Sequence, residues 1–270
     1  MSAAPLALPA TALYFVSGLL IGLRLFGPAE ARKPPRGLGI GLGVLAAALH
    51  AVLIWTQTLT ETGLNVAFFS VTSLIAWVIA VLVLASSFNK PVENLGIVLL
   101  PVAGLTVLLA WRHPGFKLLP DTTPWALQAH VLISLLAYAI LTVASVQAIL
   151  LAIQDRHLHR RQPIGFVRAL PPLQTMESLL FEMIALGFVL LSVALGTGFV
   201  FLEDMFAQHL AHKTILSVAA WTVFGILLWG RFRFGWRGRT ALRWTLAGFV
   251  VLMIAYFGSK FVVELILRRV

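Results

Sequence analysis

The sequence contains no cysteine and few charged residues, and each shortage removes a class of protein. Without cysteine the chain has no disulfide bond, no CxxC redox pair and no thiolate or thioether attachment for a cofactor. Charged residues make up 11% of the 270 residues, about half the share usual in soluble domains. Hydrophobic residues make up 60% and the mean hydropathy is +0.95. The composition predicts an integral membrane protein.

The apolar residues fall in runs long enough to cross a bilayer as helices. About 20 residues at about 1.5 Å each match a hydrocarbon layer of about 30 Å. The alternating pattern of an outer-membrane barrel is absent. We therefore predict an all-α fold, a polytopic bundle of about eight transmembrane helices forming a single membrane domain over residues 1–270. The predicted segments are 5–26, 37–57, 66–86, 95–111, 125–153, 177–202, 213–230 and 243–266.

Two of these segments need comment. The first begins almost at Met1 without a basic leader or a convincing cleavage site, so it is interpreted as a retained helix and not a removed signal peptide. The fourth is short and contains Pro101, which predicts a kinked or tilted helix.

Most of the 20 lysines and arginines fall in alternate loops, so their distribution predicts the orientation of the chain. Basic loops follow the first, third, fifth and seventh segments, whereas the opposite loops hold only Arg112, Lys117 and Lys213. By the positive-inside rule these basic loops are cytoplasmic, which places both termini outside. The net charge of +10 is therefore interpreted as topology and contact with anionic lipid, not as nucleic-acid binding.

Small residues indicate where helices approach one another. Neither the GxGxxG nor the Walker spacing of a nucleotide-binding loop is present. Glycines spaced by four residues instead predict close packing between helices. These pairs are Gly18/Gly22, Gly37/Gly41 and Gly39/Gly43.

His50 is an ionisable residue at membrane depth, where a polar side chain usually has a partner or a function. It shares one face of the second segment with small residues that include Gly43, Ala46 and Ala47. Two interpretations are open, a neutral histidine hydrogen-bonded across this seam or a ligand of haem or a metal. The sequence alone favours the hydrogen-bonded histidine.

His130 lies near the predicted outer start of the fifth segment, at the head of a mostly polar stripe. At helical spacing Ser134, Tyr138 and Ser145 follow it on the same face. Such a stripe faces protein or a cavity, because polar groups are costly in contact with lipid. A hydrogen-bonded seam between helices and a ligand site are both compatible with it.

Charged residues towards the end of the chain offer two further candidates. Lys260 and Glu264 are four residues apart in the last segment and are expected to neutralise each other, with an ion or proton path as the alternative. The outer loop EDMFAQHLAHKT contains His209 and His212, which are interpreted as exposed surface in preference to a metal site.

Three sequence blocks carry a family resemblance. They are HVLISLLAY from His130, LGFVLLSVALGTG from Leu186, and the terminal stretch AWTVFGILLWGR…GWRGR…AGFVVLMIAYFGSKFV. In order and spacing these blocks resemble the cytochrome c assembly family of haem-handling membrane proteins, which includes the CcsA and CcmC types. The resemblance covers nearly the whole chain and is closest to the YpjD-like inner-membrane branch.

The resemblance implies haem at the outer face, held by paired external histidines that flank a tryptophan-rich loop, with further histidines inside the membrane. His130 matches the first external histidine, and His50 matches the early intramembrane one. The second external position falls near Leu267 and the second intramembrane position at Trp229, so neither histidine is present. The stretch FLEDMFAQHLAHKT stands where the tryptophan-rich loop is expected.

The same resemblance predicts where a ligand lies. We expect a cavity that opens outward, bounded by the fifth segment at His130, the loop from Glu203 to Lys213 and the last segment around Lys260. The lysine would give this rim a cation suited to a propionate group. His50 and His130 are expected to face the protein interior at different depths.

The predicted function is that of a membrane haem-binding or haem-handling protein acting in cytochrome maturation or haem homeostasis, and not an enzyme. The expected cofactor is haem b, held non-covalently because cysteine is absent, with His130, His50, Tyr138 and Lys260 as candidate contacts. The expected partners are the lipid bilayer, haem and a membrane protein. An accessory or scaffold membrane protein that has lost haem binding is the alternative, and an ion or solute transporter is the third hypothesis.

Overall fold

The computed structural model describes residues 4–27, 33–60, 63–120, 124–159, 170–201 and 208–258. These ranges contain eight helices long and apolar enough to cross a membrane, which confirms the predicted fold. The chain divides into two compact units, described separately below. Unit 1 comprises residues 1–121 and 163–171, and unit 2 comprises residues 122–162 and 172–270. The single domain over residues 1–270 stays a prediction.

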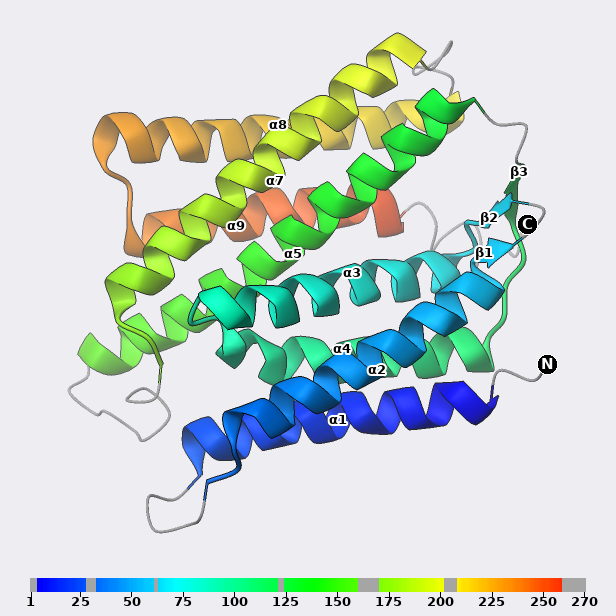
Figure 1. Ribbon diagram of the computed structural model, residues 1–270. Helices are drawn as coiled ribbons and strands as arrows, with labels where there is room; N and C mark the ends of the chain where they lie inside the picture. Colours follow the sequence, from blue (N-terminus) through cyan, green and yellow to red (C-terminus); the bar gives the residue numbers. More distant parts are fainter. Residues whose placement is uncertain are drawn as a thin grey trace. The chain divides into compact units, whose positions relative to one another are not determined.

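Unit 1 is built from four helices that pack in a ring (Figure 1). They are α1 (Ala4–Phe26), α2 (Arg36–Gln57), α3 (Phe68–Asn89) and α4 (Glu93–Arg112). Helix α1 packs against α2 and α4, and α3 packs against the same two helices. Helix α4 continues through Pro101, whose ring lies so close to Gly18 on α1 that a Cβ there would come within 2.7 Å of it. The absence of a side chain at Gly18 therefore lets the proline fit between the two helices.

Unit 2 repeats this arrangement with four helices that differ in length. They are α5 (Trp125–His159), α7 (Leu173–Phe201), α8 (Gln208–Phe234) and α9 (Gly238–Met253), the last continued by the π-helical turn η1 (Ile254–Gly258). Helix α5 packs against α7 and α9, and α8 packs against the same two. Helices α5, α8 and α9 extend several residues beyond the predicted bounds, because those ends carry charged residues that hydropathy assigns to loops. Helix α7 begins at Leu173, four residues before its predicted start.

A small antiparallel sheet at one end of unit 1 adds to the predicted all-α fold. Its strands pair in the order β1 (Leu59–Thr60), β2 (Gly63–Asn65) and β3 (Leu118–Pro120). The buried side chain of Asn65 joins β2 to the segment between α4 and β3. Its Nδ2 donates to the Gly115 carbonyl over 2.9 Å, and its Oδ1 accepts from the Lys117 N–H over 3.1 Å. Strands of two or three residues leave no periodic pattern from which they could be predicted.

The predicted glycine seam on α2 is confirmed at two positions and wrong at two others. A Cβ on Gly39 or Gly43 would come within 3.0 Å of a neighbouring helix, and at Gly43 one such neighbour is Ser17 Oγ at 2.8 Å. Among the described residues of the other helices, none lies within 4 Å of a Cβ placed on Gly37 or Gly41, so the close contact predicted for that pair is wrong. Both are exposed on the opposite face of α2, which a spacing of four residues does not reveal.

Candidate functional site

His50 is fully buried inside unit 1, where α2 packs between α1 and α3. Its Nε2 lies 2.8 Å from Ser73 Oγ on α3, and its Nδ1 lies 3.3 Å from the Tyr14 hydroxyl on α1. The tyrosine and imidazole rings meet edge to face, with centroids 5.8 Å apart. Both ring nitrogens therefore have partners, because a hydroxyl can donate to the bare nitrogen and accept from the protonated one.

This environment agrees with the hydrogen-bonded interpretation of His50. A metal ion at Nε2 would require Ser73 to move aside, since the imidazole has no free nitrogen. The buried small residues Gly43, Ala46 and Ala47 share its face of α2 and allow the neighbouring helices to approach. A role for His50 as a haem contact stays a prediction.

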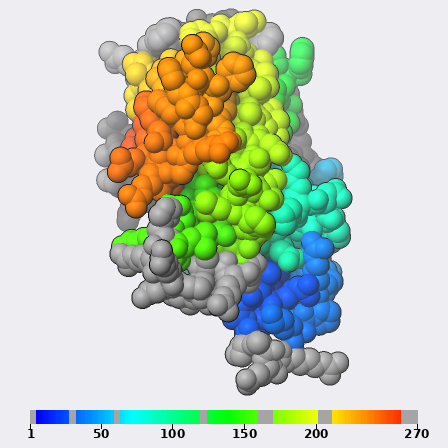
Figure 2. Space-filling view, turned by 90° about the vertical axis from the view of Figure 1, so that its left-hand side faces the viewer, coloured from blue at the N-terminus to red at the C-terminus, as the bar shows by residue number. Residues whose placement is uncertain are grey.

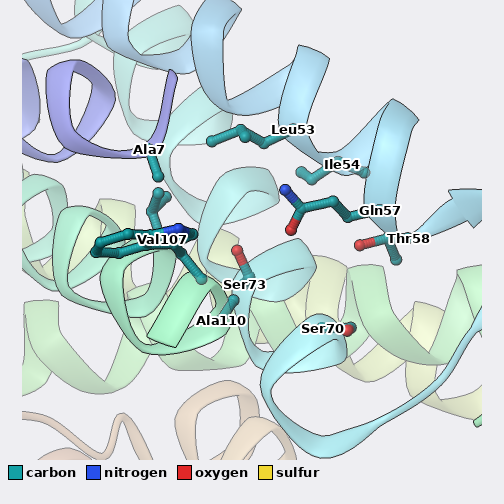
Figure 3. Close-up of a pocket in the computed structure, with 10 residues that line it drawn as sticks. Ala7, Leu53, Ile54, Gln57, Thr58, Ser70, Ser73, Val107 and Ala110 are labelled. Carbon is teal, nitrogen blue, oxygen red and sulfur yellow. The ribbon is translucent and has the colours of Figure 1, made fainter. Parts of the chain in front are cut away.

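A small cavity of about 20 Å³ lies beside this group, lined by the ends of α2 and α4 and the starts of α1 and α3. In Figure 3 the Gln57 amide and the Ser73 hydroxyl point towards the same space, with Thr58 and Ser70 nearby. A cavity needs about 10–15 Å³ to hold one water molecule. The site therefore has room for a water molecule beside Ser73 and none for a macrocycle.

His130 lies near the start of α5 in unit 2 and is half-buried. Its Nδ1 is 3.2 Å from Thr197 Oγ1 on α7. The threonine hydroxyl also lies 2.9 Å from the Val193 carbonyl and 3.0 Å from the Ala194 carbonyl, so its single proton is donated within its own helix. In the tautomer that carries its proton on Nδ1, the imidazole of His130 donates to Thr197 Oγ1. In that tautomer Nε2 has the lone pair that a metal ligand requires.

Tyr138, about two turns along α5 from His130, is buried among aromatic rings. The centroid of its ring lies 5.4 Å from that of Phe257, 5.9 Å from that of Tyr256 and 6.0 Å from that of Phe249. These rings contact one another between α5 and the end of α9. The polar stripe therefore faces protein, as predicted, and Tyr138 forms part of an aromatic wall.

Several predicted contacts of the outer site lie outside the described residues. They include Lys260 and Glu264 in the last segment and residues 202–207 in the outer loop. The predicted cavity at the start of α5 therefore stays a prediction. His212 is exposed on α8, and the side chain of His209 is not among those described. Within the described ranges, no group of three or more His, Asp or Glu residues could hold a metal ion.

The opposite end of unit 2 holds a charged site that the sequence did not indicate. Glu177 on α7 accepts from Arg231 Nη1 over 3.0 Å, and Arg237 Nε lies 4.0 Å from the same oxygen. The Arg231 guanidinium also lies 4.5 Å above the centre of the Phe181 ring. A cavity of about 750 Å³ adjoins Glu177. Its lining comes from α5, α7 and α9, so no local motif could have predicted it.

Sequence comparisons connect the chain to known proteins. The family described as "Cytochrome C assembly protein" matches residues 39–267. The inner membrane protein YpjD of Escherichia coli is 32% identical, over 96% of this chain and 100% of that protein. The cytochrome c biogenesis protein CcsA of Microcystis aeruginosa is 25% identical over 85% of this chain and 88% of its own, and CcsA of Gloeobacter violaceus is 26% identical over 92% and 91%. No solved structure matches the chain.

Proposed function

Because this chain belongs to the cytochrome C assembly protein family, we propose that it binds haem non-covalently and handles it in cytochrome maturation or haem homeostasis. Its eight apolar helices and its likeness to an inner membrane protein make it a multi-pass inner-membrane protein. The relatives named CcsA are cytochrome c biogenesis proteins, which supports haem as the ligand. The role proposed is binding and transfer, without a catalytic step.

The observation that carries the proposal is the 3.2 Å contact between His130 Nδ1 and Thr197 Oγ1. When Nδ1 donates to this hydroxyl, the ring is held in place and Nε2 is left as a bare nitrogen with a lone pair. Haem, when bound, supplies the iron that accepts this lone pair. A hydrogen bond at the second ring nitrogen is the usual support of a histidine ligand.

The remaining parts of the proposed site have supporting roles. The Tyr138 aromatic wall offers the apolar surface that ligand pockets commonly have. Lys260 is proposed to face a propionate from the last segment. His212, exposed near the start of α8, is proposed as a second histidine that would hold haem.

The absorption spectrum of the purified protein tests this proposal. Full-length protein isolated in detergent from cells supplied with a haem precursor should show a Soret band, which His130→Ala should abolish. His157→Ala is the matched control, because that histidine lies at the opposite end of α5 and bonds the Ile153 carbonyl. A wild-type protein with no Soret band, even after haem is added to it, contradicts the proposal.

A variant of Thr197 tests whether its hydrogen bond to His130 orients that histidine as a haem ligand. Thr197→Val removes the acceptor of the Nδ1 proton and should weaken haem binding about 10- to 100-fold, the usual cost of losing an outer-shell partner. Haem titration of the purified variant measures this change. Equal affinities for Thr197→Val and the wild type would show that the hydrogen bond does not orient the ligand.

The alternative function is an accessory membrane protein that keeps the family fold without haem. The environment of His50 favours it, since both imidazole nitrogens are bonded and the adjacent cavity holds about 20 Å³. In that case the wild type has no Soret band, while His50→Leu still lowers its thermal stability. The two measurements together separate the hypotheses.

A further inference from the structure

The cavity of about 750 Å³ in unit 2 lies where α5 ends, α7 begins and α8 turns into α9. Figure 2 faces this end of the unit, with the orange atoms of α8 and α9 beside the green atoms of α5 and α7. Small-molecule sites commonly measure about 300–1,000 Å³. The cavity is therefore of a size that admits a ligand headgroup.

The lining of this cavity is strongly basic. Its four arginines are Arg156, Arg237, Arg239 and Arg243. The acidic residues of the lining are Asp155 and Glu177, and Glu177 already accepts from Arg231, which does not line the cavity. No ion pair joins Arg156, Arg239 or Arg243 to any residue in the described ranges. Their charges are thus available to an anion.

The turn between α8 and α9 positions two of these arginines, Arg237 and Arg239. Gly235 and Gly238 adopt φ values of +67° and +51°, which a residue with a side chain rarely tolerates. Arg231 Nη1 donates to the Trp236 carbonyl over 3.2 Å while it also binds Glu177, so the turn is fixed to α7. Residues on either side of Gly238 therefore enter the cavity from a defined backbone.

The start of α9 adds to the positive potential. Arg237 precedes its first turn in an extended conformation, and no side chain caps the helix. The first N–H groups of a helix have no partner within it and carry about half a positive charge together. These N–H groups and the guanidinium groups are both suited to phosphate oxygens.

We propose that this cavity binds a phosphate group, presented by the headgroup of an anionic lipid or by a soluble phosphate compound. The predicted orientation places it at the cytoplasmic leaflet, where anionic headgroups are concentrated. Leu151, Leu173 and Leu242 also line it and provide apolar contacts beside the arginines. The site is separate from the outer end of α5 and is independent of the haem proposal.

Native mass spectrometry of the full-length protein in detergent, with cardiolipin or phosphatidylethanolamine added, tests the lipid source. Cardiolipin should bind the wild type, and Arg239→Gln/Arg243→Gln should weaken it about 25-fold, since each arginine near an anionic surface contributes about fivefold. The matched control is Arg112→Gln/Arg233→Gln, which removes two exposed arginines that do not line the cavity. That control should bind cardiolipin as the wild type does.

The soluble source is tested by thermal unfolding with inorganic phosphate in place of lipid. A rise in the wild-type Tm that the Arg239→Gln/Arg243→Gln variant lacks identifies a soluble phosphate compound, and a response to cardiolipin alone identifies a headgroup. Arg239→Lys/Arg243→Lys keeps the charge and should recover most of the binding, which separates a lost site from a misfolded variant. Equal binding of both probes by the glutamine variant and its control overturns the proposal.

Discussion

His50 and His130 are both histidines in membrane-spanning helices, yet units 1 and 2 place them in opposite environments. His50 is 0% exposed and both of its nitrogens have hydroxyl partners, whereas His130 is half-buried and one nitrogen is bonded. A buried imidazole with two partners stabilises its bundle, because removing it strands both partners. An imidazole with one partner keeps a nitrogen for a ligand. The number of hydrogen-bond partners, more than depth in the membrane, separates the structural environment of His50 from the ligand role proposed for His130.

The largest effect is expected when His50 is replaced by leucine. The change removes the imidazole partner of the Tyr14 hydroxyl and of Ser73 Oγ inside the bundle, at about 1–3 kcal/mol each. We expect the Tm of the protein in detergent to fall by roughly 4–24 °C, at about 2–4 °C per kcal/mol for a protein of this size. Thermal unfolding followed by circular dichroism measures it.

The triple variant Tyr14→Phe/His50→Leu/Ser73→Ala sharpens this test. It removes all three polar groups together, so no hydroxyl is left unsatisfied and much of the lost stability should return. A triple variant less stable than His50→Leu alone would show that shape complementarity and not hydrogen bonding dominates at this site.

The next largest effect on stability is expected from overpacking at Gly43, on the same face of α2 as His50. Gly43→Ala introduces a Cβ within 2.8 Å of Leu84 Cδ2 and Ser17 Oγ, and overpacking of this kind costs about 1–3 kcal/mol. Gly41→Ala is the control on the exposed face of the same helix, where no atom of another helix in the described ranges lies within 4 Å of the added Cβ. It should be neutral or stabilising by about 0.5–1 kcal/mol. Similar unfolding temperatures for the two variants would argue against a tight seam.

The ion pairs of the two units provide a third comparison. Glu177→Gln removes the partner of Arg231 in unit 2, where the side chains are 12% and 25% exposed, and should cost about 1–2 kcal/mol. Glu93→Gln removes the partner of Arg36 in unit 1, where they are 18% and 47% exposed, and should cost less than about 1 kcal/mol. Unfolding in low and high salt should reduce the effect at Glu93 more, because exposed charges are screened.

The sequence predicted the helices well and their partners poorly, for physical reasons. A run of apolar residues is a local signal, so all eight spans and the burial of His50 beside small residues could be predicted. Tyr14 and Ser73 come from other helices, and a single sequence does not state which side chains meet. For the same reason the sequence did not predict the cavity lined by Arg156 and Arg243, which lie on different helices. The spacing of four residues also led to a wrong prediction for Gly37 and Gly41. Such spacing shows that two residues share one face of a helix, but it does not show whether that face packs against another helix.

The smallest effect on stability is expected for His130→Ala, and it completes the comparison with His50. The hydroxyl of Thr197 keeps its bonds to the Val193 and Ala194 carbonyls when the imidazole is removed, so no polar group is stranded. A half-buried side chain also leaves little cavity, and the cost should stay within about 1 kcal/mol. Its Tm should therefore match that of His157→Ala within a few degrees, while its Soret band is lost. A fall in Tm as large as that of His50→Leu would make His130 a structural residue and remove the ligand role from unit 2.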